Sequence, residues 1–180
     1  MSRAVVWFTG LPASGKSTLA RQVQAHLTRA GRASLLLDGD ELRGILGEHA
    51  YGAEDRTRFY RALAALAALL ARQGIIVLVA ATAPRRADRD HARAALHGDG
   101  AFVEVWVDTP LAECEARDPK GLYARARRGE APELPGVGVA YEPPVSPEVI
   151  ATGGRDDDAV TAIDRQLDRL DSSGPVISIG

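Results

Sequence analysis

One stretch near the N-terminus has residue types and a spacing that suit the binding of a polyphosphate. Gly10–Ser17 reads Gly-Leu-Pro-Ala-Ser-Gly-Lys-Ser and matches the pattern G-x-x-x-x-G-K-[ST] in full. In this pattern the glycines let backbone N–H groups point at phosphate oxygens, the lysine reaches the β- and γ-phosphates, and the last hydroxyl ligates Mg²⁺. We therefore predict that Lys16 is catalytic, that Ser17 is the metal ligand, and that ATP is bound by Gly10, Leu11, Pro12, Ala13, Ser14, Gly15, Lys16, Ser17 and Thr18. The alternative is a glycine-rich turn that matches by chance.

A second polar group, Asp38-Gly39-Asp40, is followed by Arg43. A carboxylate here can accept the proton of an attacking hydroxyl or hold a metal-bound water, so Asp38 and Asp40 are predicted to be catalytic. Proton acceptance is a small term in phosphoryl transfer, in which positioning and charge neutralisation dominate. Arg43 is suited to binding an anionic acceptor. The alternative is an N-cap aspartate followed by a solvated arginine.

The elements that must position these groups alternate between strand and helix. Apolar runs rich in β-branched residues predict strands over Ala4–Thr9, Ala33–Leu37, Ile75–Ala80 and Phe102–Val107. Helical periodicity predicts helices over Lys16–Ala30, Glu54–Gln73, Asp88–Leu96, Pro110–Arg117 and Asp156–Leu170. The alternation predicts an α/β fold of the P-loop NTPase type, a parallel sheet with helices on both faces, as one domain over residues 1–180. An apolar tail, Val176–Ile179, is suited to an edge strand.

In such sheets ligands bind beyond the carboxyl ends of the strands, where the polar segments of this chain also fall. We expect the second strand to lie next to the P-loop strand. After the third strand, Arg85, Arg86 and Arg89 are expected to face phosphates, and Arg93 to face water. No apolar strand ends in a clear Walker-B aspartate, which favours a small-molecule kinase over a motor ATPase.

One long segment, Gly129–Glu148, contains three glycines and five prolines. A loop of this length inside a compact domain is usually functional or disordered. We predict a substrate lid over about residues 121–150. The alternative is a plain surface loop.

Composition excludes several other classes of protein. The net charge of −2 disfavours a nucleic-acid or anionic-membrane binder, and no apolar run reaches the roughly 18 residues of a membrane helix. The single cysteine, Cys114, excludes a disulfide framework within the chain. We expect a cytoplasmic enzyme with no nucleic-acid or membrane partner.

Beyond these patterns, residues Val5 to Ile150 resemble the adenylylsulfate kinase family, which phosphorylates the 3′-hydroxyl of adenylylsulfate with ATP. The resemblance depends on Trp7–Leu11, on Leu37–Asp40 with Arg43, on Asp55-Arg56 and on Asp88-Arg89. Its most specific part is Val107–Leu111 continuing through Cys114–Tyr123, followed by Tyr141-Glu142 and Pro147-Glu148.

The resemblance implies roles for individual residues. Asp40 is the base near the acceptor hydroxyl, Arg43 and Arg56 bind the phosphosulfate, and Arg117 stacks near the adenine of ATP. Lys120 begins the lid and belongs to the acceptor side. Family members are commonly homodimers, so a homodimer is expected.

The departures from the family pattern gather on the acceptor side. Tyr51 keeps an aromatic ring where the family has Phe, Phe59 stands where it has Asn, and Leu134 replaces the second ring that would cover the acceptor adenine. Where the family has two consecutive arginines, this chain has Arg61-Ala62. The predicted acceptor-binding residues are Arg43, Tyr51, Arg56, Phe59, Lys120 and Leu134. Besides an adenylylsulfate kinase, the sequence leaves open a divergent kinase acting on another alcohol and a nucleotide-binding module without transfer activity.

Overall fold

Strands and helices alternate along the chain in the computed structural model, which describes residues 3–47, 52–96, 98 and 100–172. The strands are β1 (Ala4–Thr9), β2 (Ser34–Asp38), β3 (Ile76–Ala80), β4 (Ala101–Val107) and β5 (Val149–Ala151). The helices are α1 (Lys16–Arg29), α2 (Gly39–Leu46), α3 (Ala53–Arg72), α4 (Arg86–Ala94), α5 (Leu111–Arg117), α6 (Leu122–Arg127) and α7 (Asp157–Ser172).

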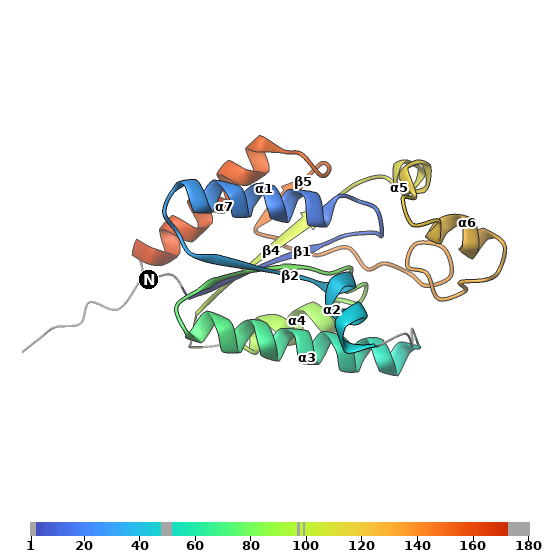
Figure 1. The fold of residues 1–180 in the computed structure, drawn as a ribbon, viewed down its shortest axis with the longest axis horizontal. Helices are drawn as coiled ribbons and strands as arrows, with labels where there is room; N and C mark the ends of the chain where they lie inside the picture. Colours follow the sequence, from blue (N-terminus) through green and yellow to red (C-terminus); the bar gives the residue numbers. More distant parts are fainter. Residues whose placement is uncertain (1–2, 48–51, 97, 99, 173–180) are drawn as a thin grey trace, which may run out of the picture.

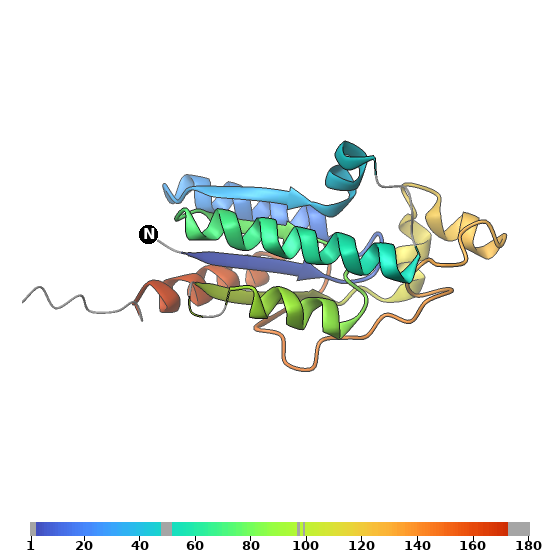
Figure 2. The ribbon, with the colours of Figure 1, turned by 90° about the horizontal axis from the view of Figure 1, so that it is seen from below.

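The five strands form one parallel sheet in the order β2-β3-β1-β4-β5. Helices α1 and α7 cover one face and α3 and α4 cover the other (Figures 1 and 2). The predicted fold class is therefore confirmed. The expectation that β2 lies beside β1 is wrong, because β3 pairs with both of them and separates them.

The burial of the central strands explains their composition. Every residue of β1 and of β3 is buried, since each of these strands has a strand on both sides and helices on both faces. Such strands are continuous apolar runs rather than alternating ones. On α1, the periodic residues Leu19, Val23 and Leu27 are buried against the sheet, as the helical spacing predicts.

The edge beside β4 is occupied by β5, which the sequence pattern did not indicate. Its three residues are too few to show a period, and Ile150 is exposed between buried Val149 and Ala151. The predicted edge strand Val176–Ile179 lies outside the described residues.

The predicted lid extends from the carboxyl side of the sheet (Figure 1). It contains the short helix α6, which the sequence analysis did not predict, and otherwise irregular chain. Its own small core consists of Cys114, Tyr123, Ala126 and Leu134, against which Leu11 of the phosphate loop packs. Within the described part of the chain, no helix has the length and apolar character needed to cross a membrane.

Candidate active site

The loop between β1 and α1 has the backbone geometry of a phosphate cradle. Gly15 precedes α1 with φ +103°, and a Cβ there would lie 2.4 Å from the Cα of Gly154, so only glycine fits. Ala13 also has positive φ, 61°, a strained value for a residue with a side chain. The loop opens directly onto the N-terminus of α1, whose unpaired N–H groups and positive dipole end favour an anion.

Lys16 lies back over this loop. Its Nζ donates to the carbonyl oxygens of Gly10 at 3.1 Å and Leu11 at 2.7 Å. Burial lowers the pKa of Lys16 to about 8, against the opposing effect of the Asp40 and Asp38 charges. The ammonium group is therefore held within the loop by backbone carbonyls.

Asp38 connects the loop to the end of β2. The hydroxyl of Ser17 donates to its Oδ2 at 2.5 Å, and its Oδ1 accepts from the backbone N–H of Asp40 at 3.0 Å, which caps α2. Asp38 is therefore both an N-cap and a neighbour of the predicted metal ligand, although β3 separates its strand from β1. A hydroxyl and a buried carboxylate are hard oxygen donors of the kind that Mg²⁺ prefers, so the residues present fit that ion.

Asp40 is exposed and is held by the base of the lid. Its Oδ2 accepts from Nζ of Lys120 at 2.7 Å, and both side chains are exposed. The structure thus brings together the predicted base and Lys120, which are 80 residues apart.

The base of the lid is fastened to the phosphate loop from the other side. Tyr123 of α6 donates its hydroxyl to the carbonyl of Pro12 at 2.9 Å, and Thr109 donates to the carbonyl of Ser14 at 2.8 Å. Arg117, the predicted adenine neighbour, lies 3.5 Å from the same Ser14 carbonyl and pairs with Glu113 at 3.1 Å. Thr109 and Tyr123 were not predicted as site residues, because the sequence gives no sign that they reach the loop.

The acceptor-side arginines are buried. Arg43 is 7% exposed and lies over the ring of Phe59, its Cζ 3.8 Å from the ring centroid. Arg56 is also 7% exposed and binds Glu133 of the lid through both its backbone oxygen and its carboxylate. The lid therefore touches the acceptor side directly, a contact between residues 77 positions apart.

Of the two remaining predicted acceptor residues, the structure describes one. Leu134 is 8% exposed and packs into the core of the lid with Cys114 and Tyr123. Tyr51 lies outside the described residues.

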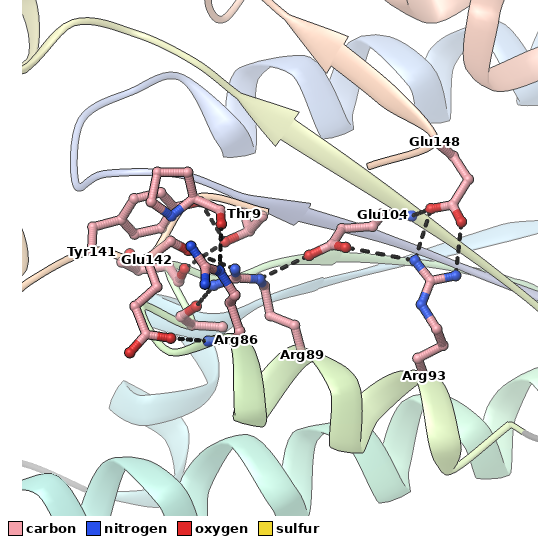
Figure 3. A network of polar contacts seen from close by, with 11 residues as sticks. Thr9, Arg86, Arg89, Arg93, Glu104, Tyr141, Glu142 and Glu148 are labelled. Atoms are coloured by element: carbon pink, nitrogen blue, oxygen red, sulfur yellow. Dashed lines mark hydrogen bonds and ion pairs between the residues drawn. The ribbon is translucent and has the colours of Figure 1, made fainter. Parts of the chain in front are cut away.

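A network of charges attaches the C-terminal end of the lid to the sheet (Figure 3). Arg89 pairs with Glu104 of β4 at 2.8 Å and donates to the carbonyls of Ala83 and Glu142. Arg93 pairs with Glu148 at 2.7 Å. The expectation that Arg89 faces phosphates is wrong, since Arg89 is 2% exposed and Glu104 neutralises it. The side chain of Arg93 is 39% exposed, so it meets water as expected, but it also pairs with Glu148. Arg86 donates from its side chain to the carbonyl of Pro143 and from its backbone N–H to Glu142, so it too is attached to the lid.

The fold and this site together define a class. A P-loop kinase is characterised by a parallel sheet with a glycine-rich phosphate loop after its central strand. It also has a lysine and a serine at the start of the next helix and a carboxylate beside that serine, as this chain does. The gluconokinase from Sinorhizobium meliloti shares this fold with a TM-score of 0.60 at 16% identity, covering 96% of this chain and 98% of that one.

Comparison with known proteins narrows the class to a family. The model of the family described as adenylylsulphate kinase matches residues 2–152. The adenylyl-sulfate kinase of Shewanella amazonensis is 47% identical over 173 residues, covering 95% of this chain and 86% of that protein. The structure of the Mycobacterium tuberculosis APS kinase CysC in complex with AMPPNP and APS matches with a TM-score of 0.82 at 39% identity, covering 94% and 98% of the two chains. The chain belongs to the adenylylsulphate kinase family.

Proposed function

We propose that this chain transfers the γ-phosphate of ATP to the 3′-hydroxyl of adenylylsulfate. Membership of the family supports the reaction. The observation in this chain that supports the reaction most is that one lid contacts both the proposed ATP site and the proposed acceptor site. The phosphate loop lies on one side, the buried Arg43 and Arg56 lie on the other, and Lys120 and Glu133 of the lid touch Asp40 and Arg56.

On the ATP side we assign the charge neutralisation to Lys16 and Ser17. Lys16 leaves the loop carbonyls when a nucleotide binds and neutralises charge on the β- and γ-phosphates. Mg²⁺ would be held by Ser17 and Asp38, and when bound it would supply further neutralisation of the phosphate charge. Arg117, which already reaches the phosphate loop, covers the adenine.

On the acceptor side we assign recognition of the anion to Arg43 and Arg56 and reception of the hydroxyl proton to Asp40. Arginine suits a phosphosulfate because its planar fork makes two charge-assisted hydrogen bonds at once. Lid closure excludes water, which otherwise competes as the phosphate acceptor. A homodimer, which the family resemblance suggests, is also proposed, and sedimentation analysis tests it.

The experiment is a steady-state assay of ADP formation with adenylylsulfate as the varied substrate. We expect a specificity constant within the usual enzyme range, above about 10⁴ M⁻¹s⁻¹. A value below about 10³ M⁻¹s⁻¹, an order under that range, would overturn the proposal.

A second candidate is a kinase of the same scaffold that phosphorylates another anionic alcohol. One observation favours it: Leu134, which stands where an aromatic ring was expected, packs into the core of the lid. The same assay with other nucleotide and sugar-phosphate alcohols separates the two candidates, because a true adenylylsulfate kinase prefers adenylylsulfate by orders of magnitude.

A further inference from the structure

Arg43 lies on an aromatic surface formed by two consecutive residues of α3, Phe59 and Tyr60. The Cζ atom of Arg43 is 3.8 Å from the centroid of the Phe59 ring and 5.8 Å from that of Tyr60. The two rings pack edge to face, with centroids 5.6 Å apart and an interplanar angle of 66°. We call this pair the aromatic platform.

The platform is below the surface. Phe59 is 3% exposed and Tyr60 6% exposed, so neither ring offers an appreciable area to a ligand. A cation above an aromatic face is held more strongly when both are desolvated. An arginine whose flat face lies against a ring presents its N–H groups at the edge of the guanidinium plane, which fixes the direction in which they can donate.

Tyr60 links Arg43 to the rest of the acceptor side. The Cζ atom of Arg43 is 5.8 Å from the centroid of the Tyr60 ring, and the backbone N–H of Ala83 and the charges of Arg43 and Arg56 all favour the ionised hydroxyl, opposing the effect of burial. Ala83 lies in the loop after β3 and has a positive φ of 38°. The hydroxyl therefore lies where both arginines and the loop after β3 meet, and burial raises its pKa, which keeps it protonated at neutral pH.

We propose that Phe59 and Tyr60 are positioning residues that fix Arg43 for an anionic group on the acceptor, without touching the acceptor themselves. The inference builds on the proposed function and specifies its substrate class, an alcohol that carries a phosphate or phosphosulfate group. An uncharged alcohol gains nothing from an arginine held in this way. Phe59, which the sequence suggested as a direct acceptor contact, acts through Arg43.

The test compares Phe59→Leu, Tyr60→Phe and Phe59→Tyr with the unaltered chain, using adenylylsulfate and ATP–Mg²⁺. Phe59→Leu removes the ring beneath Arg43, and Tyr60→Phe removes only the hydroxyl. Phe59→Tyr keeps the ring and tests rescue. The matched control is Phe102→Leu, which removes a ring beneath a different arginine, Arg93 at 4.8 Å, near the amino end of β4.

We expect Phe59→Leu to raise the KM for adenylylsulfate about tenfold, consistent with the loss of a desolvated cation–π contact. Tyr60→Phe should raise it less, and Phe59→Tyr and Phe102→Leu should leave it within about twofold. In Tyr60→Phe, the KM for ATP and the melting temperature should stay unchanged. A merely structural role would instead lower the melting temperature and would not separate the KM for adenylylsulfate from the KM for ATP.

Each outcome bears on one of the two proposals. If the unaltered chain turns over adenylylsulfate and the KM values for both substrates rise together in Phe59→Leu and Tyr60→Phe, the platform has no positioning role while the proposed function stands. Unchanged KM values in both variants lead to the same conclusion. If the unaltered chain does not turn over adenylylsulfate, the proposed function fails, and the platform inference fails with it.

Discussion

At the scale of single residues, Lys16 carries the strongest expectation. Replacing it with alanine removes the cation that neutralises the transferring phosphate while leaving the backbone of the loop in place. One lost electrostatic donor typically costs about 10²-fold in turnover. We expect Lys16→Ala to lose at least that much with an unchanged circular dichroism spectrum. Retention of more than about a tenth of the turnover would show that Lys16 has been wrongly assigned.

The same lysine gives a pH dependence. Its pKa in the free chain is lowered to about 8, so the ammonium form that binds phosphate decreases as the pH rises through that value. We expect kcat/KM for ATP to fall above about pH 8, while kcat falls only at higher pH because bound phosphates raise the pKa again. Lys16→Arg is the control, since its guanidinium stays charged and removes the decline. A flat profile to pH 10 in the unaltered chain would contradict the assignment.

Two aspartates two residues apart have different roles in this structure. Asp38 is buried, caps α2 and accepts from Ser17, whereas Asp40 is exposed and pairs with Lys120. Asp40→Asn should lower kcat far more than it weakens ATP binding, because we propose that Asp40 receives the proton of the acceptor hydroxyl. Asp38→Asn is the comparison and should weaken Mg²⁺–ATP as well. Equal losses of rate and ATP affinity in Asp40→Asn, measured by kinetics and calorimetry, would make it a structural residue.

At the scale of elements, the glutamates of the lid fall into two pairs that differ in what holds them and in how exposed they are. Glu148 is attached to Arg93 and to the backbone N–H of Glu104, and Glu142 to Arg86 and Arg89. Glu130 and Glu133, by contrast, have exposed side chains. Glu133 meets Arg56, outside the network that holds Glu142 and Glu148, so ligands that close the lid should protect the exposed pair selectively.

We therefore expect a glutamate-specific protease to cleave after Glu130 and Glu133 in the ligand-free chain. A non-hydrolysable ATP analogue together with adenylylsulfate should slow this cleavage at least tenfold, because cleavage requires the open segment. Cleavage after Glu148 should be slow in both states and serves as the internal control. Mass spectrometry identifies the sites, and unchanged cleavage at Glu133 with saturating ligands would count against a lid.

How far the sequence predicted these elements depends on whether the information is local. The phosphate loop is eight consecutive residues, and the buried residues of α1 recur at helical spacing within one helix. Both features could therefore be predicted from the sequence. The order of the strands depends on how the crossover connections run, and the spacing of residues along the chain does not show this. The sequence therefore did not predict that β3 separates β2 from β1. Glu104 was a sign that was overlooked: a charge within the apolar run of β4 requires a buried partner, which is Arg89.

At the scale of the whole molecule, the site is assembled from contacts that a single sequence does not reveal. Lys120 meets Asp40 across 80 residues, and Glu133 meets Arg56 across 77. Sequence reasoning placed Lys120 in the acceptor half by family resemblance and gave Glu133 no role. The phosphate loop is local in the sequence and could be recognised as a segment, whereas the contacts of the lid became visible only in the fold.

The residues proposed to bind ATP and those proposed to bind the acceptor are positioned by one sheet and its helices. We therefore expect both groups to lose their structure in the same unfolding transition. The phosphate loop follows β1, Asp38 ends β2, Arg56 belongs to α3, and Arg43 lies over Phe59 of α3, a helix that covers the same sheet. We propose that residues 1–180 form one cooperative domain with a single melting transition. A separate transition for the lid, seen by calorimetry, would contradict this.

Nucleotide binding should then stabilise the molecule as one unit. ADP with Mg²⁺ at about 100 times its Kd adds about 2.7 kcal/mol to the free energy of unfolding by mass action. In a domain of this size each kcal/mol raises the melting temperature by about 2–4 °C, so a rise of about 5–11 °C is expected. Lys16→Ala is the control and should lose most of the rise, while Phe102→Leu should keep it relative to its own baseline. A shift of less than 2 °C in the unaltered chain at saturating nucleotide would mean that the loop does not bind ADP in the proposed way.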